Sequence, residues 1–367
     1  RRRGWMAATQ ALLLATIAWC GAISPAGLVA PVVDWIELVP GAWSLPVPDW
    51  PSVAAFLGHP VTIACFLISI LSATQDIALD AYRRELLPEV ELGLGNSVHV
   101  NAYRIAGLVP GSLSLILADH LPWSQVFFIT ALFMLPGLVM SLAVTEIVSS
   151  GGTPKTLRQA VVEPFHEFVN RSGWREAALI LAFIFLYKLG DSLCTALATP
   201  FYLDMGFSKS EIGLVAKHAG LWPAVIGGLL GGLWMVRLGI NRALWLFGVV
   251  QMLSIFGFAW LAWLGPSATA GAEQLMQLAV VIGFEALGVG LGTAAFVAFI
   301  ARATHPLYTA TQYALFSSLA AMPRTVINSG AGWLVEQMGW FHFFLLCAVL
   351  AVPGMVLLLR VAPWRKC

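Results

Sequence analysis

The chain has 367 residues, of which 11% are charged and 59% hydrophobic, with a mean hydropathy of +0.82 and a formal net charge of +1. A soluble domain carries about a quarter charged residues, so most of this chain must lie in lipid. The balanced charge gives no basic excess to attract nucleic acid, and the five cysteines show no CxxC spacing for a metal or a disulfide framework. We expect a membrane protein with no metal, no cofactor and no nucleic-acid partner.

Ten apolar stretches are long enough to cross a bilayer, which takes about 20 residues per helix. They predict an all-α transmembrane fold, with helices one to ten at Trp5–Ile23, Val53–Ile77, Ser97–Ala118, Trp123–Val144, Ala177–Leu203, Ile212–Met235, Ala243–Leu264, Leu275–Ala301, Thr309–Leu334 and Phe341–Leu359.

The basic residues predict the orientation. With the first residue in the cytoplasm, the inside loops hold 15 Lys and Arg residues, among them Arg83 and Arg84, and the outside loops hold only Lys209. Cytoplasmic loops are enriched in basic residues, so both ends of this chain are expected in the cytoplasm.

Two connections are unusual. The outside segment 24–52 is rich in Pro and Trp and has no Lys or Arg, so it either lies on the outer membrane surface or is a variable insertion. The inside segment 145–176 contains Leu157–Asn170, which places Leu157, Val161, Val162, Phe165 and Phe168 near one face. This pattern predicts an amphipathic helix on the inner membrane surface.

An internal repeat appears when the chain is shifted by 217 residues. Asp119 then aligns with Glu336, Trp123 with Trp340, Phe127 with Phe344, and Pro136-Gly137 with Pro353-Gly354. Helices one to four align with seven to ten, whereas five and six have no partner.

The repeat predicts two parallel six-helix halves, which is the architecture of major facilitator transporters, with the first two helices missing from this chain. The chain also begins Arg1-Arg2-Arg3-Gly4, which is typical of a cytoplasmic loop. We therefore expect an N-terminal half at 1–144, a cytoplasmic linker at 145–176 and a C-terminal half at 177–367.

Eight ionisable residues fall within the expected helices or, for Asp80, three residues past the end of one, and each costs about 2.5–3.5 kcal/mol at the bilayer centre. Left unpaired, they would cost on the order of 20 kcal/mol, which exceeds the stability of a typical fold. They must therefore face an aqueous cavity or pair with one another. They are Asp76, Asp80, Arg104, Lys188, Asp191, Lys217, Glu285 and Arg324.

The four acidic residues are candidates for proton coupling. Asp76 and Asp80 are four residues apart and share a helix face, where two close carboxylates raise each other's pKa. Glu285 precedes three glycines that let helices approach closely. The alternatives are that Asp76 and Asp80 meet water at a helix end, and that Asp191 merely neutralises Lys188.

The candidates for substrate binding are basic and amide side chains. Arg104, Arg324 or Lys188 could bind an anionic group, although either arginine could instead pair with the carboxylates. Gln75 and Gln312 could form hydrogen bonds with a hydroxylated ligand.

Several segments resemble the AmpG family of muropeptide permeases within the major facilitator group. They include Ser72-Ala-Thr-Gln-Asp76-Ile-Ala-Leu-Asp80, Pro154-Lys-Thr-Leu-Arg-Gln-Ala-Val-Val-Glu163-Pro, Tyr187-Lys-Leu-Gly-Asp191 and Ala310-Thr-Gln312-Tyr. The resemblance implies proton-coupled import of anhydro-muropeptides from the periplasm across a bacterial inner membrane, for cell-wall recycling, with a link to β-lactam resistance. It also implies a monomeric, multi-pass protein that is not an enzyme.

Three alternatives stay open from the sequence. The fold could carry another amphipathic anion such as acetyl-CoA. A membrane enzyme acting on lipid-linked substrates would want a motif such as HExxH or a DxD loop, and the sequence contains neither, so no catalytic residue is assigned. A signalling scaffold would normally carry a soluble output domain.

Overall fold

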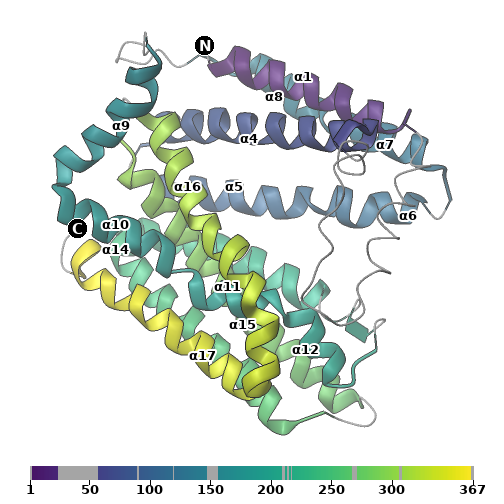
Figure 1. Cartoon of the computed structure of the whole chain (residues 1–367), viewed down its shortest axis with the longest axis vertical. Coiled ribbons are helices and arrows are strands. Elements are labelled where there is room, and N and C mark those ends of the chain that lie inside the picture. Colours follow the sequence, from purple (N-terminus) through teal and green to yellow (C-terminus); the bar gives the residue numbers. More distant parts are fainter. Residues whose placement is uncertain are drawn as a thin grey trace. The chain divides into compact units, whose positions relative to one another are not determined.

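A computed structural model of the chain describes residues 2–23, 57–88, 91–118, 120–146, 156–208, 211–212, 215, 217–266, 271–305 and 308–364. The expectation for segment 24–52 and the repeat position Asp119 lie outside these residues. The described part of the chain is helical and contains no strand, which confirms the all-α prediction (Figure 1). Six of its helices are long and apolar enough to cross a membrane, and some of these contain two of the expected stretches.

The chain divides into two compact units. The first contains Arg1–Tyr82 and Ile105–Val148, and the second contains Arg83–Arg104 and Ser149–Cys367. This grouping follows spatial contacts, whereas the division expected from the sequence follows the repeat; that division stays a prediction.

In the first unit, α1 (Arg2–Cys20) packs against α7 (Trp123–Leu132) and α8 (Leu135–Ala143). Gly137 leaves room for the side chain of Gln10, whose Oε1 accepts a hydrogen bond of 3.0 Å from Ser141 Oγ. The unit also holds η2 (Val109–Leu113), α6 (Ser114–Ala118) and most of α4 (Pro60–Leu86). The helix α4 extends past the expected end at Ile77, so the prediction that Arg83 and Arg84 lie in a loop is wrong.

In the second unit, two long helices reverse direction at glycines. In α14 (Lys217–Leu264), Gly239 has φ 74° and ψ 162°, and in α17 (Ala331–Val361), Gly339 has φ 73° and ψ 164°. Only glycine adopts this conformation readily, so each glycine joins two of the expected helices through a very short connection.

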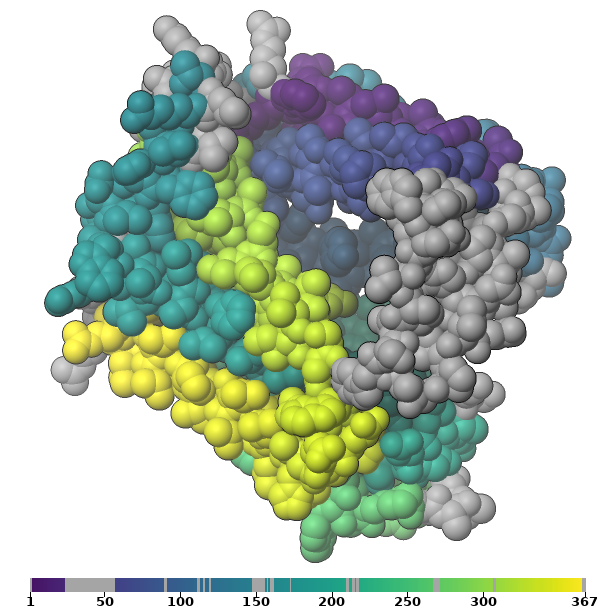
Figure 2. Space-filling model, viewed as in Figure 1, coloured from purple at the N-terminus to yellow at the C-terminus, as the bar shows by residue number. Residues whose placement is uncertain are grey.

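The described part of the second unit contains eight further elements. They are α5 (Leu92–Ala106, all but its last two residues), α9 (Leu157–Ser172), α10 (Trp174–Leu186), α11 (Leu189–Ala196), α12 (Ala198–Asp204), α15 (Ala272–Ala303), α16 (Thr309–Val326) and η5 (Ile327–Gly330). Figure 2 shows one face of this unit, where α16 and α17 lie beside α10 and α11.

The helix expected on the membrane surface is present as α9, and it contacts α10 and α16. Phe168 is buried and meets Phe316 edge to face, with ring centroids 5.0 Å apart. Val162, Phe165 and Val169 are exposed. The side chains of Leu157 and Val161 are outside the described set.

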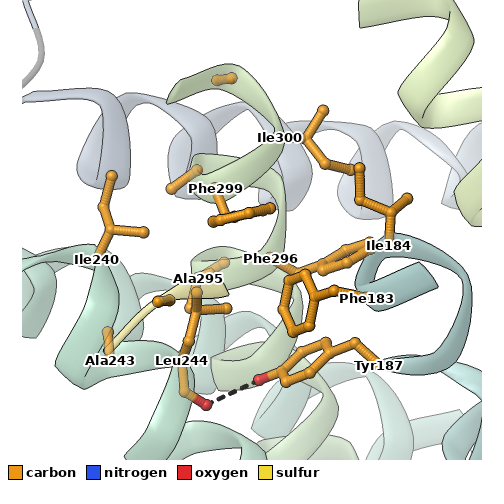
Figure 3. Close-up of a cluster of buried hydrophobic side chains, with 14 of the residues drawn as sticks. Phe183, Ile184, Tyr187, Ile240, Ala243, Leu244, Ala295, Phe296, Phe299 and Ile300 are labelled. Atoms are coloured by element: carbon orange, nitrogen blue, oxygen red, sulfur yellow. Dashed lines mark hydrogen bonds between the residues drawn. The ribbon is translucent and has the colours of Figure 1, made fainter. Parts of the chain in front are cut away.

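The core of the second unit is aromatic near the middle of its helices. Phe183 meets Phe299 edge to face at 4.9 Å, and Tyr187 stacks on Phe296 at 5.5 Å (Figure 3). The hydroxyl of Tyr187 donates a hydrogen bond of 3.0 Å to the carbonyl oxygen of Leu244. A buried tyrosine needs such a partner, so this bond fixes the start of the next segment, Lys188 to Asp191.

Candidate functional site

The fifth expected helix is broken close to its middle. Lys188 has φ −99° and ψ 3° and separates α10 from α11, and Asp191 lies in the first turn of α11. A second break follows at Leu197, with φ −110° and ψ 18°. Non-helical backbone at membrane depth is tolerated where it is buried in protein or lines an aqueous cavity, so the break marks a candidate site.

A third break, between α16 and α17, lies close to the start of α11. Asn328 lies in the short 3-10 segment η5 between α16 and α17, and its Nδ2 donates to the carbonyl oxygen of Ser192 at 3.2 Å and to its Oγ at 3.3 Å. An amide and a hydroxyl group, both half-buried, therefore tie η5 to α11 one turn after the break at Lys188.

Four of the predicted charged residues gather beside the break at Lys188. Lys188 Nζ lies 3.1 Å from Asp191 Oδ2, with side-chain exposures of 16% and 12%. Asp191, Lys188 and Arg104 all interact electrostatically with Glu285. The four side chains thus form one group of two acids and two bases, which we call the charge cluster.

Glu285 reaches the charge cluster because α15 packs closely against both parts of α14. Added Cβ atoms would lie 2.3 Å from the carbonyl oxygen of Ala224 at Gly290, and 2.2 Å from Gln251 Oε1 at Gly292. The glycines therefore bring the backbones of the two helices together, and Glu285 is left 7% exposed. Its Oε1 has no protein partner among the described residues.

Arg104 interacts with a backbone carbonyl group as well as with the two acids. Its Nη1 donates to the carbonyl oxygen of Ala224 at 2.6 Å, and the side chain interacts electrostatically with Asp191 and Glu285. Arg104 therefore has both acids close to it within the unit, and the choice between pairing with them and binding substrate stays a prediction.

The remaining predicted residues lie elsewhere. Gln75, Asp76 and Asp80 belong to α4 in the first unit, where Asp76 is exposed and the other two are half-buried. Arg324 is exposed on α16, one turn before Asn328. Their roles stay predictions.

Gln312 has partners at both ends of its amide group. Its Oε1 accepts from the backbone N–H of His305 at 2.7 Å, and its Nε2 donates to the carbonyl oxygen of Pro164 at 2.9 Å and to Glu167 Oε2 at 2.7 Å. The side chain is 1% exposed and attaches α9 to α16. This position favours a structural role, and its predicted role in substrate binding stays a prediction.

Sequence reasoning missed Gln251. It is 4% exposed on α14 and lines a small cavity together with Asp191 and Tyr187. A polar residue inside an apolar stretch was the available signal, but an uncharged amide attracts less notice than a charge in such a stretch.

Comparison with known proteins places the chain among transporters. The family model of the Major Facilitator Superfamily matches residues 1–326. An uncharacterized protein of Haemophilus influenzae is 52% identical over 312 residues, which cover 84% of this chain and 73% of that protein. The anhydromuropeptide permease of Escherichia coli K12 is 37% identical over 361 residues, which cover 98% of this chain and 66% of the permease.

More distant relatives agree with this placement. The putative transporter AmpG 4 of Rickettsia conorii is 33% identical over 304 residues, covering 80% of this chain and 70% of that protein. Among solved structures, a proton:xylose symporter matches 99% of this chain and 80% of its own, with a TM-score of 0.65 and 13% identity. The E. coli fucose:proton symporter matches 97% of this chain and 83% of its own, with a TM-score of 0.65 and 12% identity. At these identities the structures support the fold alone.

Proposed function

Because the chain belongs to the Major Facilitator Superfamily and, within it, to the AmpG-type permeases, we propose that it carries anhydro-muropeptides across a bacterial inner membrane into the cytoplasm, driven by protons. The observation that carries the substrate class is the 37% identity to the E. coli permease over 98% of this chain. Because the chain spans about two thirds of that permease, the activity of the whole protein is part of the proposal.

Proton coupling rests on the carboxyl groups of Asp191 and Glu285. Asp191 and Glu285 interact electrostatically, and a proton on one of them removes the repulsion between two close carboxylates. When that proton leaves, the pair carries two negative charges, which Lys188 and Arg104 can balance. Binding and release of one proton therefore changes the strength of the ionic interactions that Lys188 and Arg104 make with the two acids.

Substrate binding would use the same basic side chains. Anhydro-muropeptides carry carboxylates, acetamide groups and hydroxyls, so Lys188 and Arg104 are suited to the carboxylates, with Arg324 as a further candidate. The tied pair of Ser192 and Asn328 offers donors and acceptors for amide and hydroxyl groups. Protonation of the acids would free Lys188 for the substrate, which links the proton to the cargo.

The test is uptake of labelled N-acetylglucosaminyl-anhydro-N-acetylmuramyl peptide by the protein in proteoliposomes. We expect Asp191→Asn and Glu285→Gln to abolish accumulation driven by a proton gradient while they retain exchange of substrate without a gradient. For Lys188→Ala we expect the KM to rise about tenfold to a hundredfold, because a hydrogen bond to a charged group contributes about 1.5–3 kcal/mol.

Glu176→Gln is the matched control, since Glu176 is exposed in the first turn of α10, away from the charge cluster. It should transport as the wild type does. Gradient-driven accumulation that survives in both acid variants would remove these residues from proton coupling. A folded wild-type protein that takes up acetyl-CoA and no muropeptide would overturn the substrate assignment.

A further inference from the structure

A small cavity lies beside the charge cluster, between the end of α10, the start of α11, the second half of α14 and α17. Its polar lining comes from Asp191, Tyr187 and Gln251, and its apolar lining includes Met252, Ile255 and Met355. The cavity has room for about one water molecule, whose binding inside a protein takes two to four polar partners.

The three polar groups around the cavity match the needs of one water molecule. The Nε2 of Gln251 is a buried donor with no protein partner among the described residues. The carboxyl group of Asp191 is an acceptor. The hydroxyl of Tyr187 donates to Leu244, which leaves its oxygen lone pairs as a further acceptor.

Backbone packing holds Gln251 in this position. Gly288 lies against the Cα of Gln251, where an added Cβ would be 3.2 Å away, and Gly292 lies against its Oε1. The amide oxygen is thereby placed against α15, and the side chain is 4% exposed. A buried amide donor costs free energy when it is unpaired, so a water partner accounts for its place beside Asp191.

We propose that this cavity binds one water molecule that Gln251 holds against Asp191, so that Gln251 sets the proton affinity of the coupling pair without touching the substrate. The inference rests on the proposed proton coupling at Asp191. Gln251 is a positioning residue: its amide donates to the water, and the water donates to the carboxylate. This arrangement stabilises the ionised form of Asp191 and lowers the pH at which the pair takes up its proton.

The other groups that act on the pair come from several helices. Lys188 lies on the same segment as Asp191, Glu285 comes from α15 and Arg104 from α5. The uncharged side chains of Tyr187, Tyr202, Cys194 and Cys347 also lie near Asp191 or Glu285. The charged groups have the larger effect on the proton affinity of the Asp191–Glu285 pair, and the water held by Gln251 makes a smaller change to it.

The experiment measures how gradient-driven uptake depends on external pH in proteoliposomes. Gln251→Met keeps the length of the side chain and removes the donor, so the pH midpoint should rise by about one unit, a tenfold change in proton affinity. Gln251→Glu keeps the shape and adds a negative charge beside Asp191, so its midpoint should rise further. Gln277→Met makes the same chemical change on α15, outside the cavity, and should leave the midpoint unchanged.

A second readout does not depend on transport. Infrared spectroscopy follows the carboxyl C=O band of Asp191, identified by its loss in Asp191→Asn, as pH is varied; Gln251→Met should shift its titration in the same direction. A folded Gln251→Met protein with a wild-type midpoint and band titration overturns the inference and leaves proton coupling standing. Full gradient-driven uptake by Asp191→Asn overturns both.

Discussion

Gln312 uses its whole amide group inside the protein, with one acceptor bond and two donor bonds to the segment around His305 and to α9. Arg171 strengthens the same attachment, because its Nη2 donates to the carbonyl oxygen of Ala303 at 2.7 Å. Gln312 and Arg171 thus both connect the linker helix to the helix bundle of the second unit.

We expect Gln312→Ala to lower the stability of the protein by about 1–3 kcal/mol, because buried partners such as the carbonyl of Pro164 lose their hydrogen bonds. Thermal unfolding in detergent measures this change. The KM for muropeptide should stay at the wild-type value if Gln312 acts only in packing, with Gln277→Ala as the control for an amide deletion. A higher KM with unchanged stability would support the original expectation of substrate binding.

At this scale the sequence identified charges well and neutral polar residues poorly. Lys188, Asp191, Glu285 and Arg104 were found because a charge in an apolar stretch is costly and needs a partner. The Lys188–Asp191 pair was among the alternatives from the sequence. Its grouping with Glu285 and Arg104 in particular could not be derived, since that grouping depends on helix breaks and on the glycine contacts between α14 and α15. The candidate roles of Gln251 and Ser192 depend on which residues lie next to them in the fold, and the sequence does not show those neighbours.

Within the second unit, α14 shares features with α16 and α17 at a spacing of 100 residues. Pro223 in α14 corresponds to Pro323 in α16, and Gly239 corresponds to Gly339, with nearly the same backbone angles. Such a correspondence fits the repeated three-helix units inside each half of this superfamily. The two glycines therefore perform the same task, a reversal of chain direction between packed helices.

Replacement of either reversal glycine by alanine should destabilise the protein by about 1–3 kcal/mol, because this backbone region is nearly closed to residues with a Cβ. Gly332→Ala is the control, since Gly332 has ordinary helical angles and open space around its added Cβ. Thermal unfolding of Gly239→Ala, Gly339→Ala and Gly332→Ala in detergent compares the three. Equal stability of all three variants would contradict this reasoning.

For the molecule as a whole, the apolar composition and the spacing of apolar stretches were enough to predict the fold. The expected stretches fall on helices wherever the structure describes them, since a bilayer leaves the backbone few alternatives. The breaks within them could not be predicted, because Lys188 and Asn328 interrupt sequences that remain apolar on both sides. The exposed apolar side chains, such as Phe66, Val139 and Trp263, fit a surface in contact with lipid.

The orientation of the whole molecule remains a prediction that cysteine labelling can test. Glu176 and Glu273 are exposed acids in the first turns of α10 and α15, which should begin on opposite sides of the membrane. In a background without the native cysteines, a membrane-impermeant maleimide added to intact spheroplasts should label Glu273→Cys and spare Glu176→Cys. The reverse pattern would place both ends of this chain outside the cytoplasm.

The close packing of α14 and α15 has a mechanical consequence. Gly227, Gly290 and Gly231 put backbone directly against backbone, so neither helix can slide or rotate on the other without a steric clash. From Glu285 to Arg302, which donates to Asn241 Oδ1 at 2.5 Å, α15 rises about 26 Å. A displacement of α15 at Glu285 would therefore also move its other end, at Arg302. Bending during a transport cycle would then be concentrated at the broken helices beside α15.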